Sequence, residues 1–286
     1  MTINLRTNVP SLLAQRNLNA SMSGLQTAYE RLSSGLRINR ARDDAAGLAI
    51  AENLKADSKI AAVAIRNAND GISVISIADQ AIGQITNVLS RLAELAEQSA
   101  NGVFDNTQRS ALQNEFSALT SEIERIAYTT EFNGLKLLSG TGQVIFQVGF
   151  DGSSTSQVAY RGVEATLAAL GLAQTGSSVV TYSIIDVTNE ASQSAARTTL
   201  DAIQRAVNSV TSNRGVLGAA ESRLEVTISN LQVARENFMA AESRIRDVDV
   251  AGEAAELTRL NILQQAGASV LAQANQQPEL ALQLLR

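Results

Sequence analysis

Residues 203–248 read IQRAVNSVTSNRGVLGAAESRLEVTISNLQVARENFMAAESRIRDV, and this stretch decides the fold. Alternating steps of three and four residues from Ile203 meet an apolar side chain at twelve of fourteen positions without a change of phase. The positions are Ile203, Ala206, Val210, Asn213, Leu217, Ala220, Leu224, Thr227, Leu231, Ala234, Phe238, Ala241, Ile245 and Val248. Such spacing predicts one helix with a continuous apolar seam, as in a coiled coil.

The length of this helix sets the shape of the molecule. At 1.5 Å per residue the helix measures roughly 69 Å. A compact globule of this chain length is only roughly 50 Å across, as estimated from its radius of gyration. The sequence therefore predicts an elongated molecule.

Four further seams carry the same spacing. They consist of Ile75, Ala78, Ile82, Ile85, Leu89, Leu92, Ala96 and Ser99; Leu112, Phe116, Leu119, Ile123 and Ile126; Leu18, Met22, Leu25, Tyr29, Leu32 and Leu36; and Leu257, Leu260, Leu263, Gly267, Val270 and Ala274. A short loop separates the first two of these seams. In this loop Gly102 suits a helix end, and Asp105 with Gln108 suits a capping box at the next helix start. A short loop between long helices predicts antiparallel neighbours.

The middle of the chain differs in composition. Residues 139–188 are rich in Gly, Ser and Thr, and Val144, Phe146, Val148 and Phe150 recur at every second position. Alternation predicts a strand, with a turn at Asp151–Gly152, a return strand at 158–160 and a further strand candidate at 179–187. The predicted fold class is therefore mainly α: a rod of long antiparallel helices in a coiled-coil-like bundle, with paired N- and C-terminal helices and a small β-hairpin section.

Two charged segments that end in glycine, 39–47 and 246–252, interrupt the seams near the two ends of the chain. They resemble matched linkers, and they divide the chain into three predicted domains. The domains are 1–42 with 253–286, a terminal helical hairpin; 43–138 with 189–252, a helical rod; and 139–188, the β section.

The terminal helices carry more apolar surface than a lone helix pair can bury. Leu5, Val9, Leu12 and Leu13 lie on a different face from the seam that starts at Leu18. Surplus apolar surface predicts self-association, or disorder in the monomer. The residues expected to form the self-assembly core are Leu5, Val9, Leu12, Leu18, Leu25, Leu32, Leu257, Leu260, Leu263, Val270 and Leu271.

The amino-acid composition excludes the common classes of catalytic and metal-binding site that need cysteine or histidine. The chain of 286 residues has no cysteine and no histidine, so thiol nucleophiles, zinc–thiolate sites and Ser-His catalysis are absent. Asp247 and Asp249 lack the other ligands of a calcium loop, so no metal and no cofactor is expected. A net charge of −5 argues against binding to nucleic acid. The sequence shows neither a secretory signal peptide nor a run of 18 apolar residues, so no membrane insertion is expected.

Several motifs resemble those of bacterial flagellin. They are LSSGLRIN at 32–39, RDDAAG at 42–47, QSAN at 98–101, FNG at 132–134, ILQQAG at 262–267, LAQAN at 271–275 and LLR at 284–286. The resemblance covers roughly 1–140 and 190–286. Since the region between is short, the chain resembles a minimal flagellin.

The resemblance implies a structural subunit of the flagellar filament used for motility, located outside the cell. It implies that the termini line the filament core and are disordered before assembly. It also implies unfolded export through the flagellar type III apparatus, which would explain an extracellular protein without a cleavable signal. The implied partners are further copies of the chain, an export chaperone on the C-terminal segment, and the cap and hook-junction proteins.

The resemblance further implies a receptor site. Positions matching Arg91, Leu95 and Glu115 form the flagellin patch that vertebrate Toll-like receptor 5 recognises, and they lie where subunits stack axially.

The linker residues Arg40, Arg42, Asp43, Asp44, Asp247 and Asp249 are expected to form salt bridges. Hydroxyls expected to lie on outward loops are candidates for O-glycosylation; they are Ser153, Ser154, Thr155, Ser156, Ser177 and Ser178.

Other readings remain open at this point. A hook–filament junction protein has ends that resemble flagellin, although the match at 262–275 favours the filament subunit. A soluble coiled-coil adaptor would not explain the matched linkers. No catalytic constellation supports an enzyme.

Overall fold

The structure, a computed structural model, describes residues 7–140 and 142–284. Most of these residues lie in helices, so the prediction of a mainly α fold is confirmed. The helices are α1 (Val9–Ser34), α2 (Ala45–Ala100), α3 (Asn106–Thr129), α4 (Asn189–Arg246) and α5 (Val250–Leu284). The chain divides into two compact units: a central unit, Lys59–Arg235, and a terminal unit that holds the residues up to Ser58 and from Glu236 onward.

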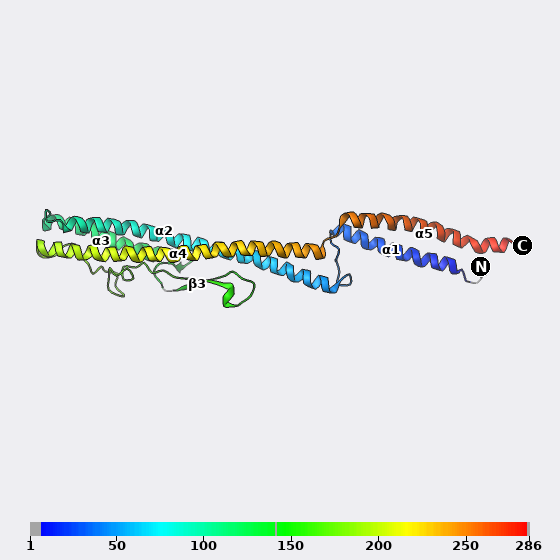
Figure 1. Ribbon diagram of the computed structural model, residues 1–286, viewed down its shortest axis with the longest axis horizontal. Helices are drawn as coiled ribbons and strands as arrows, with labels where there is room; N and C mark the ends of the chain where they lie inside the picture. Colours follow the sequence, from blue (N-terminus) through cyan, green and yellow to red (C-terminus); the bar gives the residue numbers. More distant parts are fainter. Residues whose placement is uncertain (1–6, 141, 285–286) are drawn as a thin grey trace. The chain divides into compact units, whose positions relative to one another are not determined.

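In the central unit, α3 and the enclosed parts of α2 and α4 lie side by side as an antiparallel bundle (Figure 1). The seam of α2 that runs from Ile75 to Ser99 is completely buried, with every one of its eight predicted positions 0% exposed. Ile203, Val210, Leu217 and Leu224 of α4 are buried against it. The apolar spacing read from the sequence therefore gives the core of this unit.

The capping box expected at the start of α3 is present. The Asp105 carboxylate accepts from Gln108 N (2.8 Å), and Asp105 N donates back to the Gln108 side chain (3.1 Å). This exchange satisfies two amides that a helix start leaves without intrahelical partners.

Two short antiparallel sheets follow α3. Strands β1 (Glu131–Phe132) and β2 (Leu135–Lys136) are joined by Asn133 and Gly134, both at positive φ. Strands β3 (Gln143–Gln147) and β4 (Gln157–Arg161) pair Val144 with Tyr160, which confirms the predicted hairpin. Their connection is longer than the expected turn at 151–152 and includes the 3-10 helix η1 (Ser154–Ser156).

The β3–β4 hairpin lies against the helices. Asn67 of α2 donates through its side chain to Gln147 O (2.9 Å), and a Cβ at Gly71 would meet the Phe146 ring at 3.2 Å. Val148, Val158 and Tyr160 are buried in the core of the bundle. The glycine in α2 therefore lets the hairpin approach closely.

The strand predicted at 179–187 is wrong. The structure shows only an isolated bridge between Ala173 and Val180, and no named strand crosses this segment. Side chains of the helices take the place of a partner strand. The Gln113 amide oxygen accepts from Ile184 N (2.9 Å), and Ser192 Oγ is bonded to Asp186 N (2.8 Å).

In the terminal unit, α1 and α5 form an antiparallel pair. Asn8 at the start of α1 donates to Ala274 O (2.8 Å), and Arg31 near its end lies 3.7 Å from the Glu253 carboxylate. The buried cluster between the two helices is small and consists of Leu25, Ala28 and Leu260, with Leu257 beside it.

The two seams predicted for these terminal helices are only partly correct. Met22 is 49% exposed and Tyr29 is 54% exposed, because α1 turns Ala14, Leu25 and Ala28 toward the inside. On α5 the seam buries Leu260 and Ala274, whereas Leu263 and Val270 stay exposed. Alternate seam positions therefore face away from the partner helix.

The helices break at both charged segments expected to be linkers. Gly35, at φ 72°, ends α1, and Leu36 forms an isolated antiparallel bridge with Asp247. Arg37 N donates to Arg246 O (2.6 Å), and Val248 N donates to Gly35 O (3.1 Å). Residues 35–37 and 246–248, more than 200 positions apart in the sequence, are thus joined by backbone hydrogen bonds.

An 18-residue window within α2 reaches a mean hydropathy of 1.2, which by length and composition could cross a membrane. A third of that window (33%) is buried inside the structure. Since the buried positions of α2 form the core described above, we assign this helix to the bundle.

Candidate functional site

The self-assembly residues expected on the terminal helices divide into buried and exposed groups. Leu25 and Leu260 are buried, and Leu18, Leu32, Leu257 and Leu271 are half-buried in the pair. Val9, Leu12, Leu263 and Val270 are exposed, and Leu5 lies outside the described residues. The exposed members stay available to a further partner.

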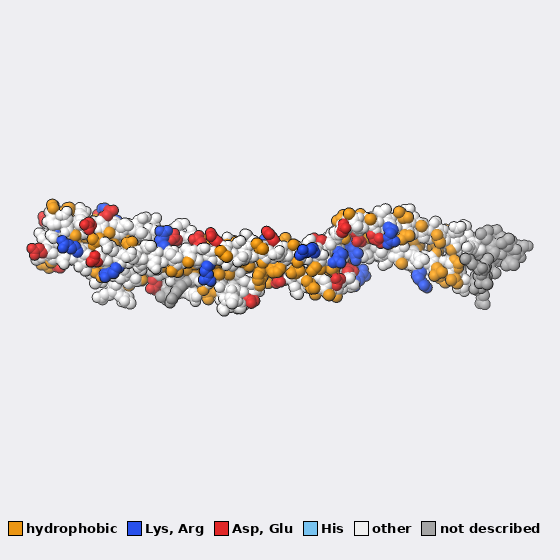
Figure 2. All heavy atoms as spheres, viewed as in Figure 1, with side chains coloured by type: hydrophobic (Ala, Val, Ile, Leu, Met, Phe, Trp, Pro, Cys, Tyr) orange, Lys and Arg blue, Asp and Glu red, His pale blue; other side chains and the backbone are white. Residues whose placement is uncertain are grey.

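Other large apolar side chains join this exposed set. They are Leu13, Met22, Tyr29 and Ile262, each at least 49% exposed. Figure 2 shows apolar side chains at the surface of the α1–α5 pair. A soluble monomer rarely exposes contiguous apolar area beyond a few hundred Å² unless the patch serves an interaction. The terminal unit therefore presents a candidate assembly surface.

The N-terminal linker holds its charged residues mainly through local bonds. Arg40 pairs with the Glu30 carboxylate (2.7 Å), and Arg42 lies 3.7 Å from Asp43. Asp43 accepts from the backbone amides of Arg40 (3.0 Å) and Asn39 (3.2 Å). The two amide bonds hold the pKa of the Asp43 carboxyl below its usual value, and the bond from the Arg40 amide has the larger effect.

Two other linker carboxylates begin helices. Asp44 accepts from Gly47 N (2.8 Å) at the start of α2, and Asp249 accepts from Ala251 N (3.0 Å) at the start of α5. Both positions stabilise a helix N-terminus. Asp247 contributes its backbone to the isolated antiparallel bridge with Leu36.

The expected receptor patch is divided between surface and core. Arg91 on α2 donates to the Glu115 carboxylate on α3 (2.9 Å) and to Glu94 (2.7 Å). Hydrogen bonding to Glu115 and then to Glu94 raises the pKa of Arg91. Leu95 is 0% exposed and belongs to the core cluster. The surface part of the patch is therefore Arg91 with Glu115 and Glu94, whereas Leu95 packs in the core beneath these side chains.

A buried arginine that the sequence did not reveal lies nearby. Arg109 on α3 is 0% exposed and donates to Ser99 O (2.9 Å), Asn101 O (3.0 Å) and the Asn189 side chain (3.1 Å). No ion pair of Arg109 occurs within the described part of the chain. The guanidinium instead lies at the C-terminus of α2, where the helix dipole favours a positive charge. Arg109 thereby joins α2, α3 and the first residue of α4.

The loop serines and the loop threonine expected to be modified differ in their bonding. Ser153 and Ser156 donate to the Asp151 carboxylate, and Ser153 also bonds Thr155 (2.6 Å). These bonds, the one from Ser156 first, lower the pKa of Asp151. The Ser177 hydroxyl accepts from Val179 N (3.1 Å), whereas Ser154 and Ser178 are exposed.

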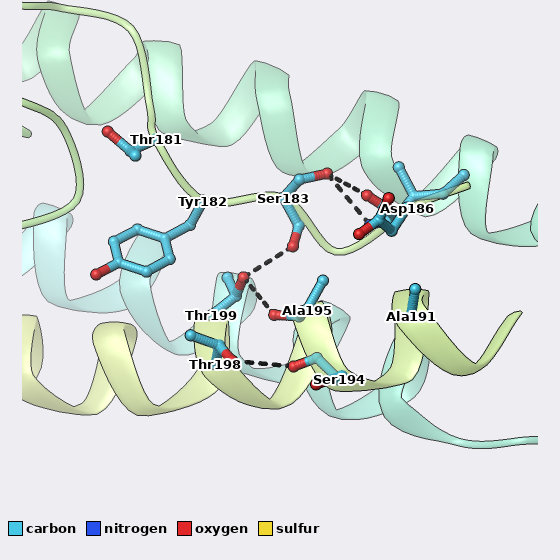
Figure 3. A pocket seen from close by; sticks show the side chains of 10 residues that line it. Thr181, Tyr182, Ser183, Asp186, Ala191, Ser194, Ala195, Thr198 and Thr199 are labelled. Atoms are coloured by element: carbon cyan, nitrogen blue, oxygen red, sulfur yellow. Dashed lines mark hydrogen bonds between the residues drawn. The ribbon is translucent and has the colours of Figure 1, made fainter. Parts of the chain in front are cut away.

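A polar pocket of about 600 Å³ lies between residues 181–186 and the start of α4 (Figure 3). Thr199 Oγ donates to Ser183 O (2.9 Å), and Thr198 Oγ donates to Ser194 O (3.0 Å). The hydroxyls thus serve internal bonds, and Asp186 is the pocket's one ionisable carboxylate. Within the described residues no three His, Cys, Asp or Glu side chains gather in a metal-binding cluster.

Comparison with known proteins agrees with this arrangement of helices. The family model of the bacterial flagellin N-terminal helical region matches residues 5–143 of the sequence. The family model of the C-terminal helical region matches residues 200–285. A flagellin of Halalkalibacterium halodurans is 45% identical over 280 residues, which cover 98% of both chains.

Two further relatives are similar over the same extent. A flagellin of Bacillus subtilis is 43% identical, and the flagellar filament 33 kDa core protein of Treponema phagedenis is 40% identical, each with 98% of both chains covered. Together with the two matched helical regions, these similarities show that the chain belongs to the bacterial flagellin family.

Proposed function

We propose that this protein is the structural subunit of a bacterial flagellar filament, built from further copies of the same chain. Family membership supports self-polymerisation and points to a filament outside the cell. The observation that carries the proposal is the exposed apolar surface on α1 and α5, which the small cluster around Leu25 and Leu260 leaves uncovered. A hook–filament junction role is not favoured.

The terminal helices form the inner part of the polymer in this proposal, and neighbouring copies cover their exposed side chains. The division into 1–42 with 253–286, 43–138 with 189–252, and 139–188 is part of the same proposal. The C-terminal segment binds an export chaperone before assembly, and the polymer ends bind cap and hook-junction proteins. The chain is exported unfolded and has no catalytic role.

Seeded growth tests the proposal. Purified chain is added to short fragments of flagellar filament and examined by negative-stain microscopy. Long extensions support a filament subunit. A short cap that stops growth would indicate a junction protein, and absence of incorporation would contradict the proposal.

A second proposed function is recognition by Toll-like receptor 5 at the surface of α2 and α3. The exposed Arg91–Glu115 pair supports it, since a charged pair fixed between two helices offers a rigid polar contact. Where this surface also contacts the next subunit, monomer signals and intact filament does not. A reporter assay on both forms tests this, and equal signalling by sealed filaments would contradict it.

Surface O-glycosylation is proposed on the loops of the β section, at Ser154 and Ser178 before the other hydroxyls. These two residues are exposed, whereas Ser153 and Ser156 are bonded to Asp151. Intact mass of protein isolated from cells tests this, because a mass equal to that of the bare chain would contradict it.

A further inference from the structure

The turn between β1 and β2 consists of two residues, Asn133 and Gly134. Asn133 has a φ of 50° and Gly134 a φ of 78°, and both residues are exposed. A left-handed backbone is unfavourable for a residue that carries a side chain. The strands on either side, paired through Phe132 and Leu135, have only two residues each and hold the turn weakly. The turn therefore opens more readily than the buried core of the bundle.

An asparagine that precedes glycine can react with the backbone of its own chain. The Gly134 nitrogen attacks Cγ of Asn133, the new C–N bond closes a succinimide ring, and the bond between Cγ and Nδ2 breaks. Ammonia leaves with the proton that the Gly134 nitrogen loses. Water then opens the ring without any change of oxidation state: opening at the new bond gives aspartate, and opening at the original peptide bond gives isoaspartate. Glycine favours the attack, because it has no Cβ to hinder the approach of its nitrogen.

Both reacting groups of this turn are available. Among the residues that the structure describes, no hydrogen bond engages the Asn133 carboxamide or the Gly134 amide. A Cβ added at Gly134 would meet no atom within 4 Å, so the space around this part of the backbone is open. Nothing in the described surroundings of the turn therefore prevents the nitrogen from reaching the carboxamide carbon.

The sequence holds one other asparagine followed by glycine, Asn101–Gly102, in the loop between α2 and α3. Asn101 is also exposed, but its side-chain oxygen accepts from Val103 N (3.1 Å), which fixes the carboxamide. Its backbone oxygen accepts from the buried Arg109 (3.0 Å), and a Cβ at Gly102 would meet the Gln193 side chain at 3.2 Å. A carboxamide held in this way is kept from turning its carbon toward the next nitrogen. The two dipeptides are identical, and only their surroundings differ.

We propose that Asn133 is a site of spontaneous deamidation in the folded protein, with water as the co-reactant, and that the fold protects Asn101 from the same reaction. The product adds one negative charge to a chain whose net charge is −5, beside the ion pair between Glu131 and Lys136. The reaction needs no enzyme, so the product accumulates as each copy ages. This inference concerns a single folded copy and is independent of the proposed function.

The two products differ in their effect on the turn. Aspartate tolerates a left-handed backbone, so it keeps the turn as it is. Isoaspartate adds one carbon to the main chain, whereas the pairing of Phe132 with Leu135 fits a turn of two ordinary residues. Leu137, directly after β2, is 1% exposed and donates from its amide to Thr130 O (3.1 Å). Isoaspartate therefore loosens the sheet next to the core.

Peptide mass spectrometry tests the proposal, because trypsin separates the two sites. It cuts after Arg and Lys, so Asn133 is the single asparagine of peptide 126–136 and Asn101 falls in peptide 92–109. The purified chain is incubated at mildly alkaline pH and sampled over days, and a sample from time zero corrects for conversion during digestion.

We expect Asn133 to deamidate at least about tenfold faster than Asn101, a ratio that corresponds to about 1.4 kcal/mol in activation free energy. Equal rates at the two sites, or no conversion of Asn133 in the folded chain, would overturn the inference. Chain unfolded in guanidinium chloride is the matched control. There the two rates should converge, because glycine follows both asparagines. A difference that persists in the unfolded chain would assign it to sequence and contradict protection by the fold.

Asn133→Asp separates the added charge from the lengthened main chain, since it reproduces the aspartate product on an ordinary backbone. The Leu137 amide of this variant should exchange with solvent as slowly as in fresh wild type. The isoaspartate fraction isolated from aged protein should exchange faster at the same amide. Equal exchange of the isoaspartate fraction and Asn133→Asp would contradict the effect assigned to the extra carbon.

Discussion

At the scale of single residues, the buried Arg109 connects three helices of the central unit. Arg109→Met leaves Ser99 O, Asn101 O and the Asn189 side chain without their donor. Loss of a donor to buried acceptors costs about 1–3 kcal/mol per group, so we expect unfolding of the monomer to become easier by about 3 kcal/mol. Urea denaturation followed by circular dichroism measures this.

The same helix offers the control. Arg125 is also on α3, but it is 61% exposed, and the ion pair that it makes among the described residues is with Glu122, one turn away. Arg125→Met should change stability by under about 0.5 kcal/mol. Equal losses in the two variants would show that Arg109 is not the specific connection between α2, α3 and α4.

Asp43 gives a prediction for pH. Its pKa is lowered on folding, chiefly by the backbone amide of Arg40. The stabilisation is therefore present above the unfolded value, about 3.9, and is lost as the pH falls through the lower folded value. Asp43→Asn should make amides of residues 39–43 exchange faster at neutral pH, and the difference from wild type should vanish in acid. A difference that persists unchanged at low pH would contradict this account.

Arg91→Ala addresses the receptor surface. The monomer should stay as stable as wild type, because exposed ion pairs contribute only about 0–1 kcal/mol. Truncation of a buried interface anchor commonly costs about 2 kcal/mol, which corresponds to receptor binding weaker by roughly thirtyfold. Surface plasmon resonance with monomer measures the affinity. Full binding by Arg91→Ala would place the receptor contact elsewhere.

At the scale of helices, what could be predicted depended on how completely a seam is buried. The seam from Ile75 to Ser99 was readable because one face of α2 is enclosed by α3, α4 and the hairpin. On α1 the same spacing misplaced Met22 and Tyr29, since a single partner helix covers a narrower face. The resemblance placed Leu95 in a receptor patch with Arg91, but the enclosed face of α2 is wide enough to include Leu95.

Tertiary bonds set the features that no local pattern reveals. The segment 179–187 has strand-like composition, yet Gln113 and Ser192 satisfy its backbone in place of a second strand. Arg109 looks like any helix arginine in the sequence, and only its three acceptors show its role. The high exposure of the Val103 and Val187 side chains likewise depends on the loops before α3 and α4, which come together only in the folded chain.

Helix α5 supplies an element-scale prediction with an internal control. Ile262 is 61% exposed, whereas Leu260 on the same helix is buried. Ile262→Asp should leave the monomer's melting curve unchanged and raise the critical concentration for polymerisation at least about tenfold, since apolar anchors at interfaces are worth about 2 kcal/mol. Leu260→Ala should weaken the α1–α5 pair in the monomer as well. Normal assembly by Ile262→Asp would contradict the proposed assembly surface.

At the scale of the whole molecule, the two units differ in how much of their apolar surface they bury themselves. The core cluster of the central unit draws on α2, α3, α4 and the hairpin, whereas the terminal pair buries Leu25, Ala28 and Leu260. Regions with few buried contacts open more readily than well-packed cores. In the proposed polymer, neighbouring copies of the chain stabilise the terminal helices, which bury little apolar surface within one copy.

Hydrogen exchange compared between monomer and polymer tests this central claim most directly. The account predicts fast exchange at residues 9–34 and 250–277 in the monomer, strong protection of the same residues in the polymer, and protection of 75–99 in both forms. Slow exchange of the terminal helices in the monomer, or no gain in their protection on polymerisation, would contradict it.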